Sequence, residues 1–178
     1  MSVVRISSIT VYPLKSGSGI NQLDTIALPT GLYGDRHLII TDSTGNFVTQ
    51  RQMPTLSQLQ AQLGDGSIRI QKGSNYLDLS VPTPKQRTAR VKIWNDSVSA
   101  IDLGDNAAEF LLRNLGKHRG RTMRLYMKDE HREAWDGTQV HPYYFADGFP
   151  YLVTNEASLR DLQSRIKDAH GEQDAEIM

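Results

Sequence analysis

The first part of the chain alternates between short apolar runs and polar turns, and this pattern predicts β-strands. Segments rich in β-branched and apolar residues are separated by glycine, proline or asparagine at intervals of about 8–12 residues, which is typical of an antiparallel barrel or sandwich. Glycine-containing turns at residues 42–46 and 64–66 predict two hairpins. The strands that we expect lie at residues 3–13, 22–28, 37–41, 47–49, 56–63, 67–71, 76–81, 89–93 and 98–103.

The period changes to that of a helix after Gly104. Apolar residues recur at helical spacing between Asp105, the expected N-cap, and Gly116, which is expected to end the helix. A strand is expected at residues 121–127. Residues 128–145 are polar and show no clear period, so we expect a long loop there.

The end of the chain predicts one more strand and one more helix. The strand is expected at residues 149–153, and Thr154 or Asn155 is expected to cap a helix with Leu159 and Leu162 on one face. The predicted fold class is therefore mixed α+β and mainly β. We expect an antiparallel β-barrel-like domain over residues 1–120, followed by the start of a second barrel with helices over residues 121–178.

Composition narrows the classes of function. The 178 residues include 20 basic and 20 acidic side chains, so no net field draws the protein toward nucleic acid or an acidic membrane. There is no cysteine, which excludes disulfides, thiolate metal ligands and a cysteine nucleophile within this sequence. No apolar run approaches the ~20 residues of a membrane helix, and the N-terminus lacks a signal peptide, so we expect a cytoplasmic protein.

Three cations stand where extended segments give way to turns. Lys15, Arg36 and Arg51 each follow an apolar-alternating stretch, which is how a rigid scaffold presents side chains to a ligand. We therefore predict a local anion pocket. Cations at strand ends are also typical of solvated surface residues, because most charged side chains are exposed.

Other candidate chemistry is weaker. The five histidines show no ligand spacing, so no metal ligand is assigned. The basic segment at residues 117–124 fits nucleic acid or an acidic partner, but also a solvated helix end. Ser16 has no histidine in a recognisable motif, and the Gly-x-Ser-x-Gly sequence of hydrolases does not occur, so no catalytic residue is assigned.

Four motifs resemble the MOSC proteins that carry an N-terminal β-barrel domain. This family includes the amidoxime-reducing components and the bacterial reductase that detoxifies N-hydroxylated base analogues. The resemblance follows the family's order along nearly the whole chain. The motifs are Tyr-Pro-Leu-Lys-Ser at residues 12–16, Gly-Leu-Tyr-Gly-Asp-Arg at 31–36, Phe-Val-Thr-Gln-Arg at 47–51, and Asp-Gly-Phe-Pro-Tyr-Leu-Val-Thr-Asn-Glu-Ala-Ser-Leu at 147–159.

The resemblance implies a molybdenum cofactor, a pterin dithiolene with a terminal phosphate, held between two barrels. Lysine and serine donors suit phosphate oxygens, and the arginine fork binds phosphate or carbonyl acceptors. The start of the fourth motif matches a second loop through which the family contacts the cofactor, called here the second contact loop. Phe149 in this loop stands where relatives often have a small hydroxyl residue. The candidate cofactor-binding residues are Lys15, Ser16 and Arg36 from the first motifs, Arg51 from the anion pocket, and Gly148 and Phe149 from the second contact loop.

The family implies further parts that this sequence does not contain. Relatives continue with an Arg-Phe-Arg-Pro-Asn segment and a cysteine that ligates molybdenum, whereas this sequence ends at Met178. We therefore expect a fragment that is inactive alone, with catalysis belonging to the complete protein. Electrons are expected from a flavin reductase or a ferredoxin-like protein, with an iron–sulfur cluster in a partner or a C-terminal domain. The family also implies pyridoxal phosphate binding and a role in detoxification.

Three hypotheses follow. The first is a molybdenum-cofactor reductase of N-hydroxylated compounds such as amidoximes. The second is a non-catalytic module that binds molybdopterin or a phosphorylated ligand, or that carries sulfur or cofactor. The third is a small barrel that binds nucleic acid through residues 117–124, with steep salt dependence, which the zero net charge disfavours. Our prediction is the first, with no nucleic acid or membrane partner.

Overall fold

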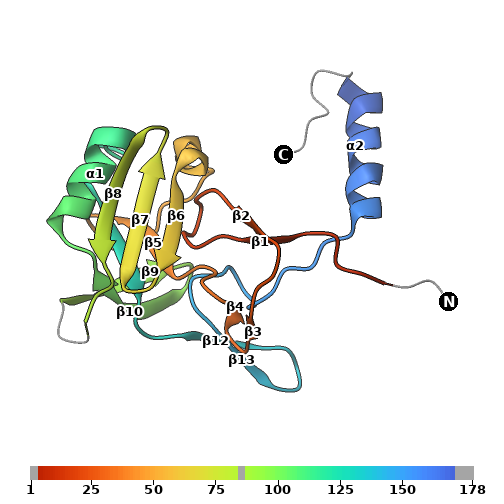
Figure 1. The fold of residues 1–178 in the computed structure, drawn as a ribbon, viewed down its shortest axis with the longest axis horizontal. Helices are drawn as coiled ribbons and strands as arrows, with labels where there is room; N and C mark the ends of the chain where they lie inside the picture. Colours follow the sequence, from red (N-terminus) through yellow and green to blue (C-terminus); the bar gives the residue numbers. More distant parts are fainter. Residues whose placement is uncertain (1–3, 84–86, 171–178) are drawn as a thin grey trace.

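The computed structural model describes residues 4–83 and 87–170, and its centre is a four-stranded antiparallel sheet (Figure 1). The order of the strands across this sheet is β5 (Leu38–Asp42), β11 (Met123–Lys128), β10 (Asp96–Asp102) and β9 (Thr88–Ile93). The β5 strand is buried along its entire length. A strand shielded on both faces reads as a continuous apolar run rather than an alternating one.

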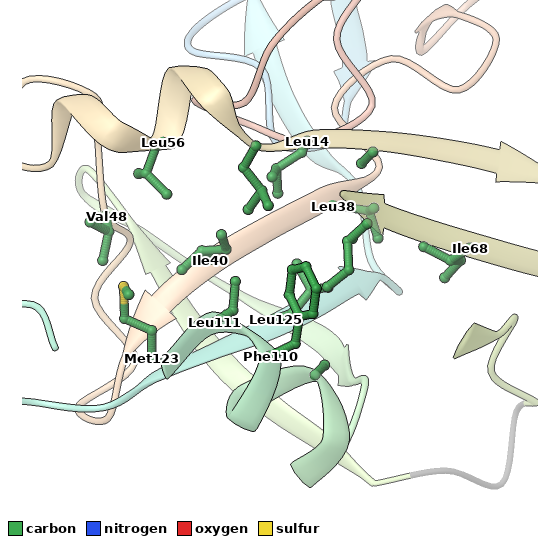
Figure 2. Close-up of a cluster of buried hydrophobic side chains, with 14 residues drawn as sticks. Leu14, Leu38, Ile40, Val48, Leu56, Ile68, Phe110, Leu111, Met123 and Leu125 are labelled. Atoms are coloured by element: carbon green, nitrogen blue, oxygen red, sulfur yellow. The ribbon is translucent and has the colours of Figure 1, made fainter. Parts of the chain in front are cut away.

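A second sheet and a helix cover the first sheet and enclose the main core (Figure 2). The second sheet is an antiparallel meander of β6 (Gln60–Gly64), β7 (Ser67–Lys72) and β8 (Asn75–Ser80). The α1 helix (Asp105–Leu115) packs against β11 and β8. Side chains from both sheets, α1 and the 3₁₀ helix η1 (Pro54–Gln58) meet in this core, among them Leu14, Leu38, Ile40, Leu56, Ile68, Phe110, Leu111 and Leu125.

Shorter elements extend from this body. Two small antiparallel pairs precede β5, and a hairpin and a second helix follow β11. In Figure 1 the second helix stands apart from the sheets. These elements are β1 (Ile9–Val11) with β2 (Ile20–Gln22), β3 (Ala27–Leu28) with β4 (Gly31–Leu32), β12 (Arg132–Trp135) with β13 (Val140–Tyr143), and α2 (Glu156–His170).

The predicted fold class, mixed α+β and mainly β with an antiparallel barrel-like unit, is confirmed. The division into domains at residue 120 stays a prediction. None of the helices in the described ranges is both long and apolar enough to cross a membrane.

Helix boundaries follow the sequence closely. The α1 helix ends at Gly116, whose amide donates to the carbonyl of Leu112 at 3.0 Å and whose φ of 79° suits glycine. Its N-cap is Gly104 rather than Asp105, and no side chain caps this end. Of the two residues predicted to cap α2, Thr154 and Asn155, it is Asn155 whose Oδ1 accepts from the amide of Ala157, at 2.7 Å.

Several predicted strands are shorter or replaced. Residues 4–8 are outside any strand, the pairing at residues 47–49 is an isolated bridge at Phe47, and residues 56–63 divide between η1 and β6. The predicted strand at residues 149–153 is wrong, because this segment pairs with no strand. Its apolar residues line a pocket or remain exposed.

The loop predicted at residues 128–145 is also wrong, because it contains the β12–β13 hairpin. The hairpin turn is organised by Asp136, whose Oδ1 accepts from the amides of Thr138 and Gln139 at 2.7 and 2.9 Å. Such an Asx turn needs no apolar period. An alternating apolar pattern therefore does not mark this hairpin in the sequence.

Candidate functional site

A pocket of about 630 Å³ opens where four loops meet. The first loop follows β1, the second precedes β5, the third follows the turn after β5, and the fourth joins β13 to α2. The β9–β10 turn lines one further side of the pocket. The structure brings all six candidate residues to this pocket, namely Lys15, Ser16, Arg36, Arg51, Gly148 and Phe149. Their role in binding a cofactor stays a prediction.

Lys15 is placed by the core residue that precedes it. Leu14 is fully buried, and the amide of Lys15 donates to the carbonyl of Leu38 at 2.8 Å. This anchoring turns the Lys15 side chain into the pocket, where only 6% of the residue is exposed. Its Nζ donates to Oδ1 of Asp147 at 2.7 Å. A charged amine is thus held in a largely dry position by one carboxylate.

Lys15 and Asp147 each stabilise the charged form of the other. Burial lowers the pKa of Lys15, while the hydrogen bond and the charge of Asp147 oppose this effect. Burial alone would raise the pKa of Asp147, but Lys15 reverses the direction, so that this pKa lies below its usual range. Asp147 is therefore ionised at neutral pH and accounts for one of the three donors of the ammonium group.

Arg36 is oriented by its neighbour. Its Nη1 lies 2.6 Å from both oxygens of Asp35, and its guanidinium carbon lies 4.4 Å from the centre of the Tyr12 ring. Asp35 is itself fixed by the amide of Tyr12, which donates to its Oδ1 at 2.7 Å. The loop after β1 thus fixes the carboxylate that holds the arginine, and Arg36 lines the pocket.

The turn after Lys15 is tight. Ser16 has a φ of 65°, in the left-handed region, and a Cβ on Gly17 would lie only 2.8 Å from the carbonyl oxygen of Leu59. The carbonyl of Ser16 accepts from the Gln50 side chain at 3.1 Å. This contact joins the first motif to the third, because Arg51 follows Gln50 directly. Glycine at position 17 is therefore required by close packing.

Two important pocket residues were missed in the sequence. Trp94 lies in the β9–β10 turn and donates its Nε1 hydrogen to Oδ1 of Asp147 at 3.1 Å. Asp147 begins the fourth motif but was not assigned a role, although it binds both Trp94 and Lys15. A tryptophan in a two-residue turn was the available signal, because tight turns usually hold glycine, asparagine or aspartate.

The second contact loop is open on the pocket side. A Cβ on Gly148 would meet nothing within 4 Å, so a ligand can approach the backbone there. Phe149 is half exposed and its ring centre lies 6.1 Å from that of His141. The loop passes so close to β4 that a Cβ on Gly31 would lie 2.8 Å from the carbonyl oxygen of Pro150. Tyr151 also donates its hydroxyl hydrogen to the carbonyl of Leu28.

The other candidates from the sequence were a metal site and the basic segment at residues 117–124. No group of three or more His, Cys, Asp or Glu side chains suited to a metal ion occurs within residues 4–83 and 87–170. In the basic segment, Arg124 donates through Nε and Nη2 to the two oxygens of Asp102 at 2.8 and 2.9 Å. Arg121 lies 3.6 Å from Asp42. Part of the segment's charge is thus matched by carboxylates of the central sheet.

His37, which follows Arg36, is kept neutral by its surroundings. Burial, and to a smaller extent the charge of Lys128, lowers the pKa of His37 from 6.5 to about 3. Its ring meets that of Tyr144 edge to face at 5.1 Å. The unfolded chain takes up a proton near pH 6.5, whereas the folded protein does not until about pH 3.

We expect this difference to appear as acid sensitivity. Below about pH 6.5 the free energy of unfolding should fall by up to ~1.4 kcal/mol per pH unit because of His37. The His37→Gln variant lacks this titration, so its stability should change less between about pH 7 and pH 5.5. Urea unfolding of both proteins across this window measures the effect. Parallel pH curves would show that His37 is not the residue responsible.

Comparisons with known proteins agree with the motif pattern. Residues 3–118 match the sequence model of the family described as MOSC N-terminal beta barrel domain. The chain is 26% identical over 176 residues to Mitochondrial amidoxime-reducing component 1 of Mus musculus, covering 91% of this chain and 51% of that protein. It is 27% identical over 167 residues to Molybdenum cofactor sulfurase of Drosophila mojavensis, covering 89% of this chain and 21% of that protein.

A solved structure also shows a partial likeness. A solution structure from Bordetella bronchiseptica aligns with a TM-score of 0.43 and 14% identity, over 52% of this chain and 71% of that one. The chain spans about half the length of the amidoxime-reducing relative from Mus musculus.

Proposed function

Because the chain belongs to the family of MOSC N-terminal beta barrel domains, we propose that its pocket binds the phosphate and pterin of a molybdenum cofactor. The observation that carries the proposal is the convergence of Lys15, Arg36 and Arg51 on one pocket from three separate turns. Three like charges around one cavity repel one another, and an anion bound among them would offset this repulsion. Asp35 and Asp147 offset part of this repulsion, and both already have a cationic partner.

The residues present fit the phosphorylated part of such a cofactor. The Lys15 ammonium has two donors beyond the one that Asp147 accepts, and Arg36 keeps the part of its fork that Asp35 does not bind. The open backbone at Gly148 leaves space for a bulky group beside them. A phosphate needs several donors arranged around it, and this pocket offers them from different loops.

Each residue then has a distinct task. Lys15 and Ser16 bind the phosphate oxygens, while the fixed fork of Arg36 sets the orientation of the ligand. Arg51 adds an exposed charge at the rim, and Gly148 allows close approach of the backbone. Phe149 covers the ligand and excludes water, which strengthens every charge interaction inside the pocket.

For the complete protein we propose reduction of N-hydroxylated compounds such as amidoximes and N-hydroxylated bases. The bound cofactor would supply the two-electron chemistry, while this chain holds and orients it. The proposal draws on the similarity to the amidoxime-reducing relatives. The chain spans about half the length of the relative from Mus musculus. Electron supply by a flavin reductase or a ferredoxin-like protein with an iron–sulfur cluster, and a cytoplasmic location, are parts of the same proposal.

A second candidate is a binding or carrier module without catalysis. It is favoured by the similarity to Molybdenum cofactor sulfurase, in which the matching region is 21% of the protein. Both candidates require the same anion pocket. They differ in turnover, because only the first predicts reduction of a simple amidoxime such as benzamidoxime when electrons are supplied to the complete, cofactor-loaded protein.

The Arg36→Gln substitution tests cofactor binding directly. We expect about tenfold less bound pterin, since a charge-assisted contact contributes ~1.5 kcal/mol. The pterin is measured by its fluorescence after oxidative release from the purified protein.

The matched control is Arg69→Gln, which removes an exposed arginine that pairs with Asp78 away from the pocket. Its pterin content should equal that of the unsubstituted protein. Thermal unfolding of both variants shows whether Arg36 also supports the fold through Asp35. Equal pterin content in two folded variants would refute the proposed site.

A further inference from the structure

The pocket has an aromatic wall that phosphate binding does not explain. Trp94 is 52% exposed and lines the same pocket as the cations Lys15 and Arg36. Phe47, which meets Trp94 edge to face at 4.9 Å, lies beneath the Lys15 ammonium at 5.4 Å from its ring centre. An indole left partly in water presents a large apolar face to whatever enters the pocket.

The backbone at Trp94 is in an unusual conformation. Its φ is 53°, in the left-handed region where a bulky residue is an outlier. Glycine, asparagine or aspartate would fit this turn with less strain. Strained residues of this kind concentrate at functional sites, where the surrounding structure holds them in place.

The surrounding contacts do hold Trp94 in place. Its Nε1 donates to Asp147, and two residues further along Asp96 binds the buried Arg132 at 2.6 Å. Arg132 also donates to the carbonyl of Ala146 at 2.7 Å, next to Asp147. The β9–β10 turn and the loop after β13 are therefore tied together by two sets of contacts, one through the indole and one through Arg132. A ring fixed in this way loses little conformational entropy when a ligand binds.

Arg51 faces the indole from the other part of the rim. Its guanidinium carbon lies over the Trp94 ring, 5.7 Å from the centre. Arg51 is exposed, and no ion pair involves it within the described residues 4–83 and 87–170. A flat ring placed between two planar groups needs about 3.5 Å on each side. A small outward movement of this exposed side chain provides that space.

The aromatic wall and the anion site lie within reach of one small molecule. Oδ1 of Asp147 accepts from both Lys15 Nζ and Trp94 Nε1, at 2.7 and 3.1 Å. We propose that Trp94 and Arg51 clamp a planar heteroaromatic ring whose anionic group binds Lys15 and Arg36. Trp94 is then the residue that selects ring-bearing anions over simple ones. This inference rests on the proposed function, because it assigns the second half of the same pocket.

The test compares two ligands that share a phosphate and differ in the ring. Guanosine 5′-monophosphate carries a flat heterocycle, and ribose 5-phosphate lacks it. Isothermal titration calorimetry on the chain should show tighter binding of the nucleotide by about 5- to 100-fold, which is the range for stacking on an aromatic side chain. Equal affinities for the two ligands would overturn the proposal.

Substitutions at Trp94 separate stacking from a structural role. Trp94→Leu should reduce nucleotide affinity to that of ribose 5-phosphate and leave ribose 5-phosphate affinity unchanged. Trp94→Phe keeps an aromatic face without the N–H donor, so it should recover most of the preference for the nucleotide. Trp135→Leu is the matched control, because Trp135 is exposed on β12 and does not line the pocket. An equal loss of both ligands in Trp94→Leu would indicate a structural role alone and overturn the clamp.

Fluorescence gives an independent measure. The sequence has two tryptophans, so the Trp135→Phe variant reports on Trp94 alone. Nucleotide binding should quench its emission, whereas ribose 5-phosphate should change it little. The Lys15→Met variant tests the proposed anion site separately from the proposed clamp. Weaker binding of both guanosine 5′-monophosphate and ribose 5-phosphate would support the anion site. Unchanged affinity for ribose 5-phosphate in Lys15→Met would refute that site even if Trp94 still selects the ring.

Discussion

Lys15→Met is expected to weaken binding of a phosphate-bearing ligand by about 100-fold, or ~3 kcal/mol. Two effects act in the same direction. The substitution removes a buried cation that is proposed to donate to the ligand. It also leaves the Asp147 carboxylate without its cationic partner inside the proposed anion pocket. Methionine preserves most of the aliphatic stem, so packing around Leu14 and Phe47 should change little.

A double variant distinguishes the two effects. In Lys15→Met/Asp147→Asn the repelling charge is gone, and binding should recover by about tenfold relative to the single variant. The quantity to measure is the dissociation constant for ribose 5-phosphate by titration calorimetry, with Arg69→Gln as the charge-matched control. A single variant that binds within about threefold of the unsubstituted protein would show that Lys15 does not contact the anion.

Phe145→Ala is expected to lower the free energy of unfolding by ~3–5 kcal/mol. Phe145 is fully buried in a second cluster with Ile39, Ile93 and Tyr126. Removing its ring leaves a cavity among side chains from β5, β9 and β11, which backbone hydrogen bonds hold in one sheet, so the strands cannot move together to fill it. Its amide also donates to the carbonyl of Arg36 at 3.2 Å, so loosening here reaches the pocket.

Phe149→Ala is the matched comparison, four positions further along the same loop. Phe149 is half exposed, and its loss should change stability by less than ~1 kcal/mol while opening the pocket to water. Urea unfolding of the two variants gives the difference in free energy. Similar destabilisation in both would mean that the loop after β13, rather than the Phe145 ring, controls stability.

Local patterns were sufficient wherever a residue's neighbours in sequence decide its structure. The Gly64 to Gly66 hairpin turn and the α1 helix with Gly116 as its C-cap were predicted, and Asn155 was one of the two predicted caps of α2. Each depends on turn or cap chemistry within a few residues. Prediction was wrong for residues 128–145 and 149–153. The first segment contains a hairpin whose turn is formed by Asp136 and needs no apolar period, and most apolar residues of the second line a pocket instead of pairing in a strand.

Sequence alone determined the mainly β fold class and the placing of three cations at turns. It also determined the family motifs, which bring Lys15, Ser16, Arg36, Gly148 and Phe149 into the candidate set. These are properties of periodicity and of short motifs, which survive without knowledge of distant contacts. The match of residues 3–118 to the family model likewise depends on the order of residues along the chain and not on distant contacts.

Only the tertiary structure decided what surrounds those cations. Lys15 and Asp147 are 132 positions apart and pair because the loop after β13 folds back over the first turn. Trp94 joins them because the β9–β10 turn ends at the same edge as both loops. Such convergence depends on strand register and sheet order, which no local period encodes. It brings three separate turns together into one pocket that is lined by charged and aromatic side chains.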